Sequence, residues 1–169
     1  MLRFFAPRSG TMLVFAALLG ACTGDSDGTP TRPTSANPTA DWQRVESNVA
    51  RVLIPPSLSP TESRWSIAYS GGLGERVWID RVSRGGTLEA RVDSAMYAIT
   101  RSGAAEVQRD YVTAAGREGV RVKIARQGTF EWHWFFPGPG VFWSFFCRGP
   151  TDSRDFCDQV LSTLELIEP

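Results

Sequence analysis

Two aromatic runs near the C-terminus, separated by a Pro-Gly-Pro-Gly segment, constrain the fold most. The first run is Phe130–Phe136 and the second is Val141–Cys147, with Pro137–Gly140 between them. Runs rich in aromatic and β-branched residues around such a turn predict a β-hairpin. The second run carries large apolar side chains in both phases of a strand. We therefore expect this strand in the middle of a sheet that is covered on both faces.

The rest of the chain from Trp42 to Pro169 shows short strand patterns and two helical patterns. The strand patterns cover residues 49–54, 65–69, 76–82, 106–113 and 120–124. Thr87 can cap a helix that ends near Arg101, since apolar residues recur there at helical spacing. A second amphipathic helix is expected at about 152–165. The sequence predicts one α+β domain, residues 42–169, with an antiparallel sheet of about six strands flanked by two helices.

The first residues have the pattern of an export signal rather than of a folded domain. Arg3 and Arg8 precede an apolar run of eight residues, 12–19, which is too short for the roughly 20 helical residues that span a bilayer. Leu19-Gly20-Ala21-Cys22 resembles the lipobox of bacterial lipoproteins. The resemblance implies that residues 1–21 are a signal peptide, that cleavage precedes Cys22, and that Cys22 carries lipid. The alternative is an ordinary signal whose cleavage site lies beside a cysteine.

The segment after Cys22 cannot contribute to a hydrophobic core. Residues 23–41 contain no Val, Ile, Leu, Met, Phe, Tyr or Trp but several prolines. We expect residues 22–41 to comprise the lipidated cysteine and a disordered tether. Thr23 stands where an Asp would resemble an inner-membrane retention signal. The expected location is therefore the cell envelope outside the cytoplasmic membrane, and the outer membrane in a cell that has two.

The charge balance gives no sign of a nucleic-acid partner. The chain has 18 basic and 18 acidic residues and a formal net charge of zero, so bulk electrostatic attraction to phosphates is not expected. The partners we expect are the membrane, through the lipid, and an envelope protein or small molecule.

The two remaining cysteines form the one even pair. In an exported protein, Cys147 and Cys157 are expected to form a disulfide. A redox role is less favoured, because nine residues separate the thiols and no Cys-x-x-Cys motif is present. One histidine and two thiols are too few for a structural zinc site. No metal and no cofactor are expected.

Three further residues are candidates for a binding site. His133, the single histidine, shares a strand face with Glu131, and the two could hold a proton or a water between them. The alternative is an ordinary pair on the wetter face of a sheet. Trp78 lies opposite in phase to Val77 and Ile79, so it would meet a partner if no helix covers its face. A Ser-His-Asp triad cannot be drawn, whereas a pair of catalytic carboxylates stays possible.

The order of elements near the C-terminus resembles a known fold. A strand, a Gly116-Arg117 turn, the aromatic hairpin and a last helix ending in Leu161-Ser162-Thr163-Leu164 are similar to the PsbP-like, Mog-type fold. That fold also occurs in mycobacterial lipoproteins of the Lpq group. The resemblance covers about residues 49–166 and implies an antiparallel sheet between helices. It implies binding or accessory work and identifies no ligand.

These observations favour a lipid-anchored envelope protein with a non-enzymatic binding or accessory domain. The alternatives are an envelope hydrolase that uses carboxylates on a polysaccharide or peptidoglycan, and a carrier for an apolar ligand. Paired acids in a groove would support the hydrolase, and an empty apolar cavity would support the carrier.

Overall fold

The computed structural model describes residues 39–83, 85–150 and 154–169. The expected signal peptide, Cys22 and most of the expected tether lie outside these residues. Residues 39–41 form a turn in which the Trp42 amide donates to the Thr39 carbonyl at 3.1 Å. Neither helix in the described part of the chain has the length and apolarity needed to span a bilayer.

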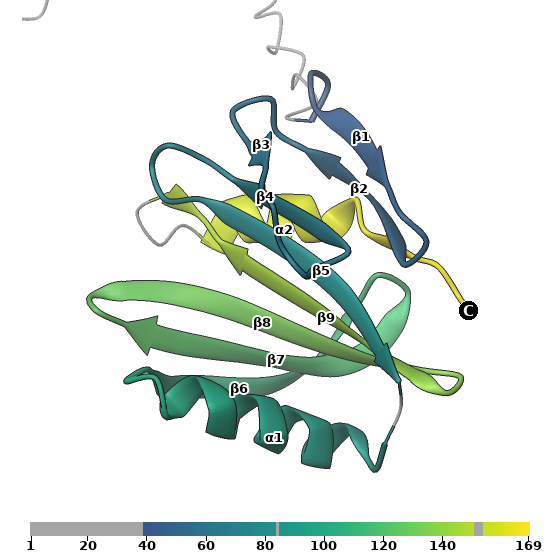
Figure 1. The fold of residues 1–169 in the computed structure, drawn as a ribbon, viewed down its shortest axis with the longest axis vertical. Helices are drawn as coiled ribbons and strands as arrows, with labels where there is room; N and C mark the ends of the chain where they lie inside the picture. The colour runs from purple at the N-terminus through teal and green to yellow at the C-terminus, as the bar shows by residue number, and fades with distance from the viewer. Residues whose placement is uncertain (1–38, 84, 151–153) are drawn as a thin grey trace, which may run out of the picture. The chain divides into compact units, whose positions relative to one another are not determined.

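Seven strands form one antiparallel sheet in the order β3-β4-β5-β9-β8-β7-β6 (Figure 1). Their bounds are β3 Ser59–Pro60, β4 Ile67–Ser70, β5 Arg76–Ser83, β6 Ala105–Ala114, β7 Arg117–Arg126, β8 Thr129–Gly138 and β9 Val141–Arg148. The aromatic hairpin is the β8–β9 pair, and β9 is the central strand, as its apolar residues on both faces predict. The expected α+β class with an antiparallel sheet is confirmed.

A second, three-stranded sheet has the order β1-β2-β10 and was not expected. Its strands are β1 Gln43–Glu46, β2 Ala50–Ile54 and β10 Glu165–Leu166. The total number of strands is therefore larger than the expected six or so. Strands β1, β3 and β10 contain two to four residues, mostly exposed. Such segments have no alternation of buried and exposed residues for a sequence pattern to reveal.

Two helices lie on opposite faces of the large sheet. Helix α1, Leu88–Thr100, begins as expected at Thr87, whose Oγ1 accepts a hydrogen bond from the Ala90 amide at 3.2 Å. It packs on β6, β7 and β8 (Figure 1). Helix α2, Arg154–Ser162, packs on β2 and β9.

Helix α2 ends earlier than the expected residue 165. The Thr163 hydroxyl donates to the Val160 carbonyl and accepts from the Leu53 amide of β2, at 2.8 and 3.0 Å. This contact draws the chain out of the helix and into β10, which pairs with β2. The expected start near residue 152 lies outside the described residues.

The large sheet separates two hydrophobic cores. On the α1 side, Val92 and Met96 pack against Val120, Val122, Ile124 and Phe135. On the α2 side, the core combines the small sheet with side chains of β8 and β9, and its largest members are Trp134, Phe136, Trp143 and Phe145. Successive strand residues point to opposite faces, so one aromatic hairpin supplies both cores.

The turn of the aromatic hairpin is shorter than expected. Pro137 and Gly138 belong to β8 and lie opposite Phe142 and Val141. A Cβ atom at Gly138 would lie 2.1 Å from the ring of Trp143, so this close approach requires glycine. The Trp143 indole donates to the Val49 carbonyl at 3.1 Å and thereby ties the hairpin to the small sheet.

The structure contains the expected disulfide between Cys147 and Cys157. Their Cα atoms are 5.7 Å apart, and both residues are fully buried. The bond joins the end of β9 to α2, and on the chain-entropy model a loop this short contributes about 2.7 kcal/mol. It therefore fixes α2 on the sheet.

Replacing both cysteines by alanine should lower the free energy of unfolding by about 3 kcal/mol, because the unfolded chain loses its crosslink. Urea unfolding of the full chain would measure this. The unmodified chain in a strong thiol reductant serves as the control, since it should unfold at a similarly low urea concentration. Equal stability of the oxidised chain and the variant would contradict the assignment.

Candidate functional site

A row of four rings crosses the α1 side of the large sheet. Trp78 of β5 lies opposite Phe146 of β9, and His133 of β8 lies opposite Phe146 on its other side. The ring centroids are 4.8 Å apart for Trp78 and Phe146 and 4.7 Å apart for His133 and Phe146. Trp65, just before β4, stacks on Trp78 at 5.7 Å. We call Trp65, Trp78, Phe146 and His133 the aromatic row.

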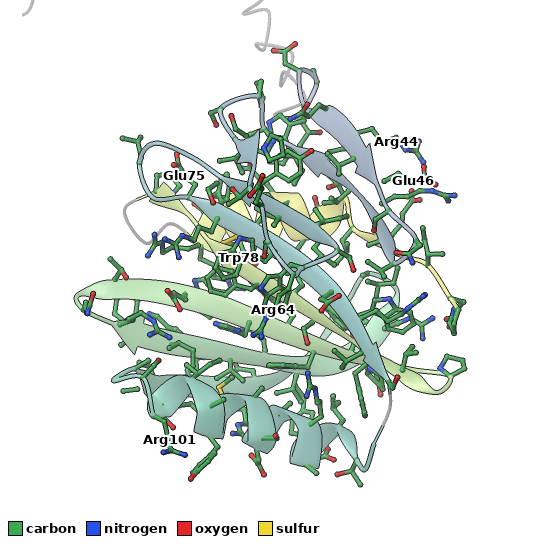
Figure 2. The ribbon with its side chains drawn as sticks, in the orientation of Figure 1. Arg44, Glu46, Arg64, Glu75, Trp78 and Arg101 are labelled. Atoms are coloured by element: carbon green, nitrogen blue, oxygen red, sulfur yellow. A yellow bond between two sulfur atoms is a disulfide. The ribbon has the colours of Figure 1, made fainter. Side chains whose placement is uncertain are left out.

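The aromatic row forms the floor of a cleft of about 660 Å³. Helix α1 packs on β6, β7 and β8, so it forms one wall of the cleft instead of covering β5. The wall residues from α1 are Arg91, Ser94, Ala95, Ala98 and Ile99. Figure 2 labels Trp78 and Arg64, which both line this cleft.

A buried carboxylate lies in the floor of the cleft, beside the aromatic row. Glu131 is 4% exposed. Its carboxylate oxygens lie 3.5 Å from Nε of Arg126, 3.8 Å from Nη1 of Arg148 and 3.9 Å from Nε2 of His133. Two guanidinium groups thus compensate the buried charge, as a carboxylate in this position requires.

The ionisation states of the two floor residues follow from their surroundings. Burial lowers the pKa of His133, and the charge of Arg126 adds to this effect, while Glu131 opposes it. Burial alone would raise the pKa of Glu131, but His133, Arg126 and Arg148 outweigh it and the net shift is downward. At neutral pH we therefore expect a neutral His133 beside an ionised Glu131.

The lining of the cleft carries more positive than negative charge. The arginines that line it are Arg64, Arg76, Arg91, Arg126 and Arg148, and Glu131 is the one carboxylate among the described lining residues. Arg64, Arg76 and Arg91 form no ion pair with any described residue. The guanidinium of Arg76 instead lies 5.4 Å from the centroid of the Trp78 ring.

Several nitrogens in the cleft lining are buried and have no hydrogen-bond partner among the described residues. They are Nε1 of Trp78, Nε of Arg91 and Nε2 of His133. The first two can only donate, and a buried donor without an acceptor destabilises the folded state. The free hydrogen-bonding capacity of the cleft therefore consists mainly of donors.

The three candidate residues of the sequence, Trp78, Glu131 and His133, all line this cleft. Trp78 is half-buried. The sequence did not point to Phe146 or to the cleft arginines. Arg76 does share the strand phase of Trp78, which was the one available signal.

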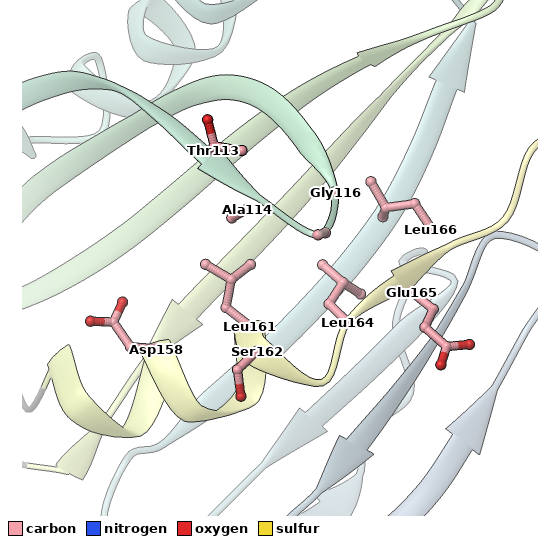
Figure 3. A pocket seen from close by; sticks show the side chains of 10 residues that line it. Thr113, Ala114, Gly116, Asp158, Leu161, Ser162, Leu164, Glu165 and Leu166 are labelled. Atoms are coloured by element: carbon pink, nitrogen blue, oxygen red, sulfur yellow. The ribbon is translucent and has the colours of Figure 1, made fainter.

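A second hollow of about 670 Å³ lies between the β6–β7 turn and the end of α2 (Figure 3). Its charged lining residues are Asp158 and Glu165, and its apolar contacts come mainly from Leu161, Leu164 and Leu166. No buried polar atom without a partner belongs to the described residues of this hollow. We therefore take the cleft on the α1 side as the candidate site.

The cleft has no evident metal set, because within the described ranges no three His, Cys, Asp or Glu side chains gather at one point. Its lining also offers Glu131 without a second carboxylate, whereas glycoside cleavage uses two. The arrangement can stack a ring and bind acceptor groups.

Comparisons with known proteins show the fold alone. No protein-family model and no curated protein sequence matches the chain. The solution structure of cyanobacterial PsbP (CyanoP) from Synechocystis sp. PCC 6803 is similar, with a TM-score of 0.57 and 12% identity over 88% of this chain and 98% of that one. A crystal structure from Bacteroides thetaiotaomicron VPI-5482 has a TM-score of 0.45 and 12% identity, over 70% of this chain and 45% of that one. The chain has a PsbP-like fold.

The lowered pKa of His133 predicts a loss of stability on mild acidification. The unfolded histidine takes up a proton near its usual pKa of 6.5, while the folded one stays neutral to lower pH. Its contribution is complete above about pH 6.5 and is lost below it, by at most about 1.4 kcal/mol per pH unit.

In His133→Gln, the free energy of unfolding should depend less on pH between 6.5 and 5 than in the unchanged chain. Urea unfolding at several pH values would measure both slopes. In the unchanged chain, the contribution of Glu131 is present above its usual pKa of 4.5 and is lost at still lower pH, outside this range. Identical slopes for the two proteins would show that His133 is not held neutral by the fold.

Proposed function

We propose that this chain is an exported lipoprotein, held on a membrane through acylated Cys22, that displays a non-enzymatic binding domain in the cell envelope. The leader and the Leu19–Cys22 lipobox resemblance support the anchor. Two or three acyl chains bind a bilayer much more durably than one. In a cell with two membranes, Thr23 favours the outer one. The order of elements also resembles the mycobacterial Lpq-group lipoproteins.

The observation that carries the binding role is the cleft above the aromatic row. Its volume of about 660 Å³ lies in the range that encloses small ligands, about 300–1,000 Å³. Aromatic residues line it together with a few convergent polar groups, and this combination is typical of ligand sites. The carrier alternative is less favoured because the cleft contains five arginines. The hydrolase alternative is less favoured because Glu131 lies between guanidinium groups, which favours its ionised form and suits it poorly to act as a general acid.

The anchor is tested by Cys22→Ser in the native host. Metabolic labelling with palmitate should label the unchanged protein and leave the variant unlabelled, because the thiol that receives the diacylglyceryl group is missing. The Cys147→Ala/Cys157→Ala chain is the matched control and should keep its label. Equal labelling of Cys22→Ser, or an unmodified thiol at Cys22 in the native protein, would overturn the anchor.

The binding role is tested by a photo-crosslinking amino acid at position 94, on the α1 wall of the cleft. In the intact envelope, Ser94 replaced in this way should give a covalent adduct of a ligand or partner, detected by mass spectrometry. The control places the same group at Asp158, which lines the hollow in Figure 3. No adduct at position 94, or the same adduct at both positions, would contradict binding in the cleft.

A further inference from the structure

We infer that the cleft recognises a small organic anion, in which a flat ring carries a carboxylate or a phosphate. The inference rests on the proposed binding role of the cleft and adds the chemical class of the ligand. Three independent features support it: the uncompensated arginines, the buried donors and the half-buried rings of the aromatic row.

The charge balance of the cleft calls for an anion. Glu131 compensates one of the two charges of Arg126 and Arg148, which lie at 3.5 and 3.8 Å. Arg64, Arg76 and Arg91 have no carboxylate partner among the described residues. A guanidinium group binds carboxylates and phosphates through two parallel hydrogen bonds. The anion would therefore bind at these three side chains and away from Glu131.

The buried nitrogens call for acceptor atoms. Nε1 of Trp78 and Nε of Arg91 are donors and lack a partner in the described chain. They come from β5, which contributes to the floor of the cleft, and from α1, which forms one wall. A carboxylate or phosphate offers several acceptor lone pairs and can serve both donors once these two side chains turn toward the cleft.

The rings call for a flat apolar body next to the anion. Trp65 and Trp78 are half-buried and stack at 5.7 Å, and Phe146 continues the row 4.8 Å from Trp78. A ligand ring placed on this row gains offset stacking. Because the Arg76 guanidinium lies 5.4 Å from the Trp78 centroid, a group attached to such a ring reaches it directly.

The test uses 2-naphthoate and 2-naphthyl phosphate as probes, and 2-naphthalenemethanol as their neutral counterpart. The full chain has six tryptophans, whose indole N–H signals can be followed by NMR in non-ionic detergent. Trp78→Phe identifies the Trp78 signal. We expect the anionic probes to shift the Trp65 and Trp78 signals saturably and to bind at least about ten-fold more tightly than the alcohol. The Trp143 indole, buried on the other face and bonded to Val49, should stay unchanged.

Two variants test the anion contacts. Arg76→Gln and Arg91→Gln should each weaken binding of the anionic probes by about ten-fold while leaving the alcohol unaffected, because one charge-assisted contact is lost. Arg101→Gln is the matched control, since Arg101, labelled in Figure 2, caps the C-terminal end of α1 and is absent from the lining of the cleft. It should bind all three probes as the unchanged chain does.

Several results would overturn the inference. They are equal binding of the alcohol and the anions, unchanged affinity in both arginine variants, and shifts that include Trp143 or exclude Trp78. A preference between carboxylate and phosphate, in contrast, specifies which anion is recognised. Failure of these probes together with an adduct at position 94 would refute the ligand class alone. Failure of both would refute the binding role as well.

Discussion

The structure depends on one strand that is apolar on both faces. Every residue of β9 from Phe142 to Cys147 is buried. Such a strand is stable only when both of its faces are covered. Helix α2 and the small sheet cover one face, and on the other face the rings of Trp78 and His133 flank Phe146. Pairing with β9 fixes the register of its neighbours β5 and β8, because a shift of either strand by one residue would move its side chains to the opposite face of the sheet.

The two layers differ in how completely they cover the sheet. The α2 side is fastened by the Cys147–Cys157 disulfide and by the hydrogen bond from Trp143 to Val49. On the α1 side, Val92 and Met96 anchor the helix over β7 and β8. Helix α1 is thus offset from the centre of the sheet, and the rings of β5 and β9 form the floor of a cleft. The cleft on the α1 side can remain open because the disulfide and the Trp143–Val49 hydrogen bond hold the α2 side together without help from α1.

The sequence revealed features that depend on local pattern, such as the aromatic hairpin, the Thr87 cap and the cysteine pair. It did not reveal β1, β3 and β10, because their pairing partners, and not their own residues, define them. The placement of Trp78 and His133 on either side of Phe146 depends on the register of β5, β9 and β8, which no local pattern contains. Nothing in the sequence singled out the arginines of the cleft, because 17 of the 18 basic residues are arginine.

The charge of the cleft depends on which of the buried groups in its floor are ionised. Glu131 can be ionised at 4% exposure because Arg126 and Arg148 lie beside it. His133, close to Arg126, avoids a further buried cation by remaining neutral, and burial keeps its pKa low. Glu131 with Arg126 and Arg148 therefore carries one net positive charge, and Arg64, Arg76 and Arg91 add three more to the lining of the cleft. Because these arginines and the half-buried rings of Trp65 and Trp78 line the same cleft, charge and apolar surface are available to the same small molecule.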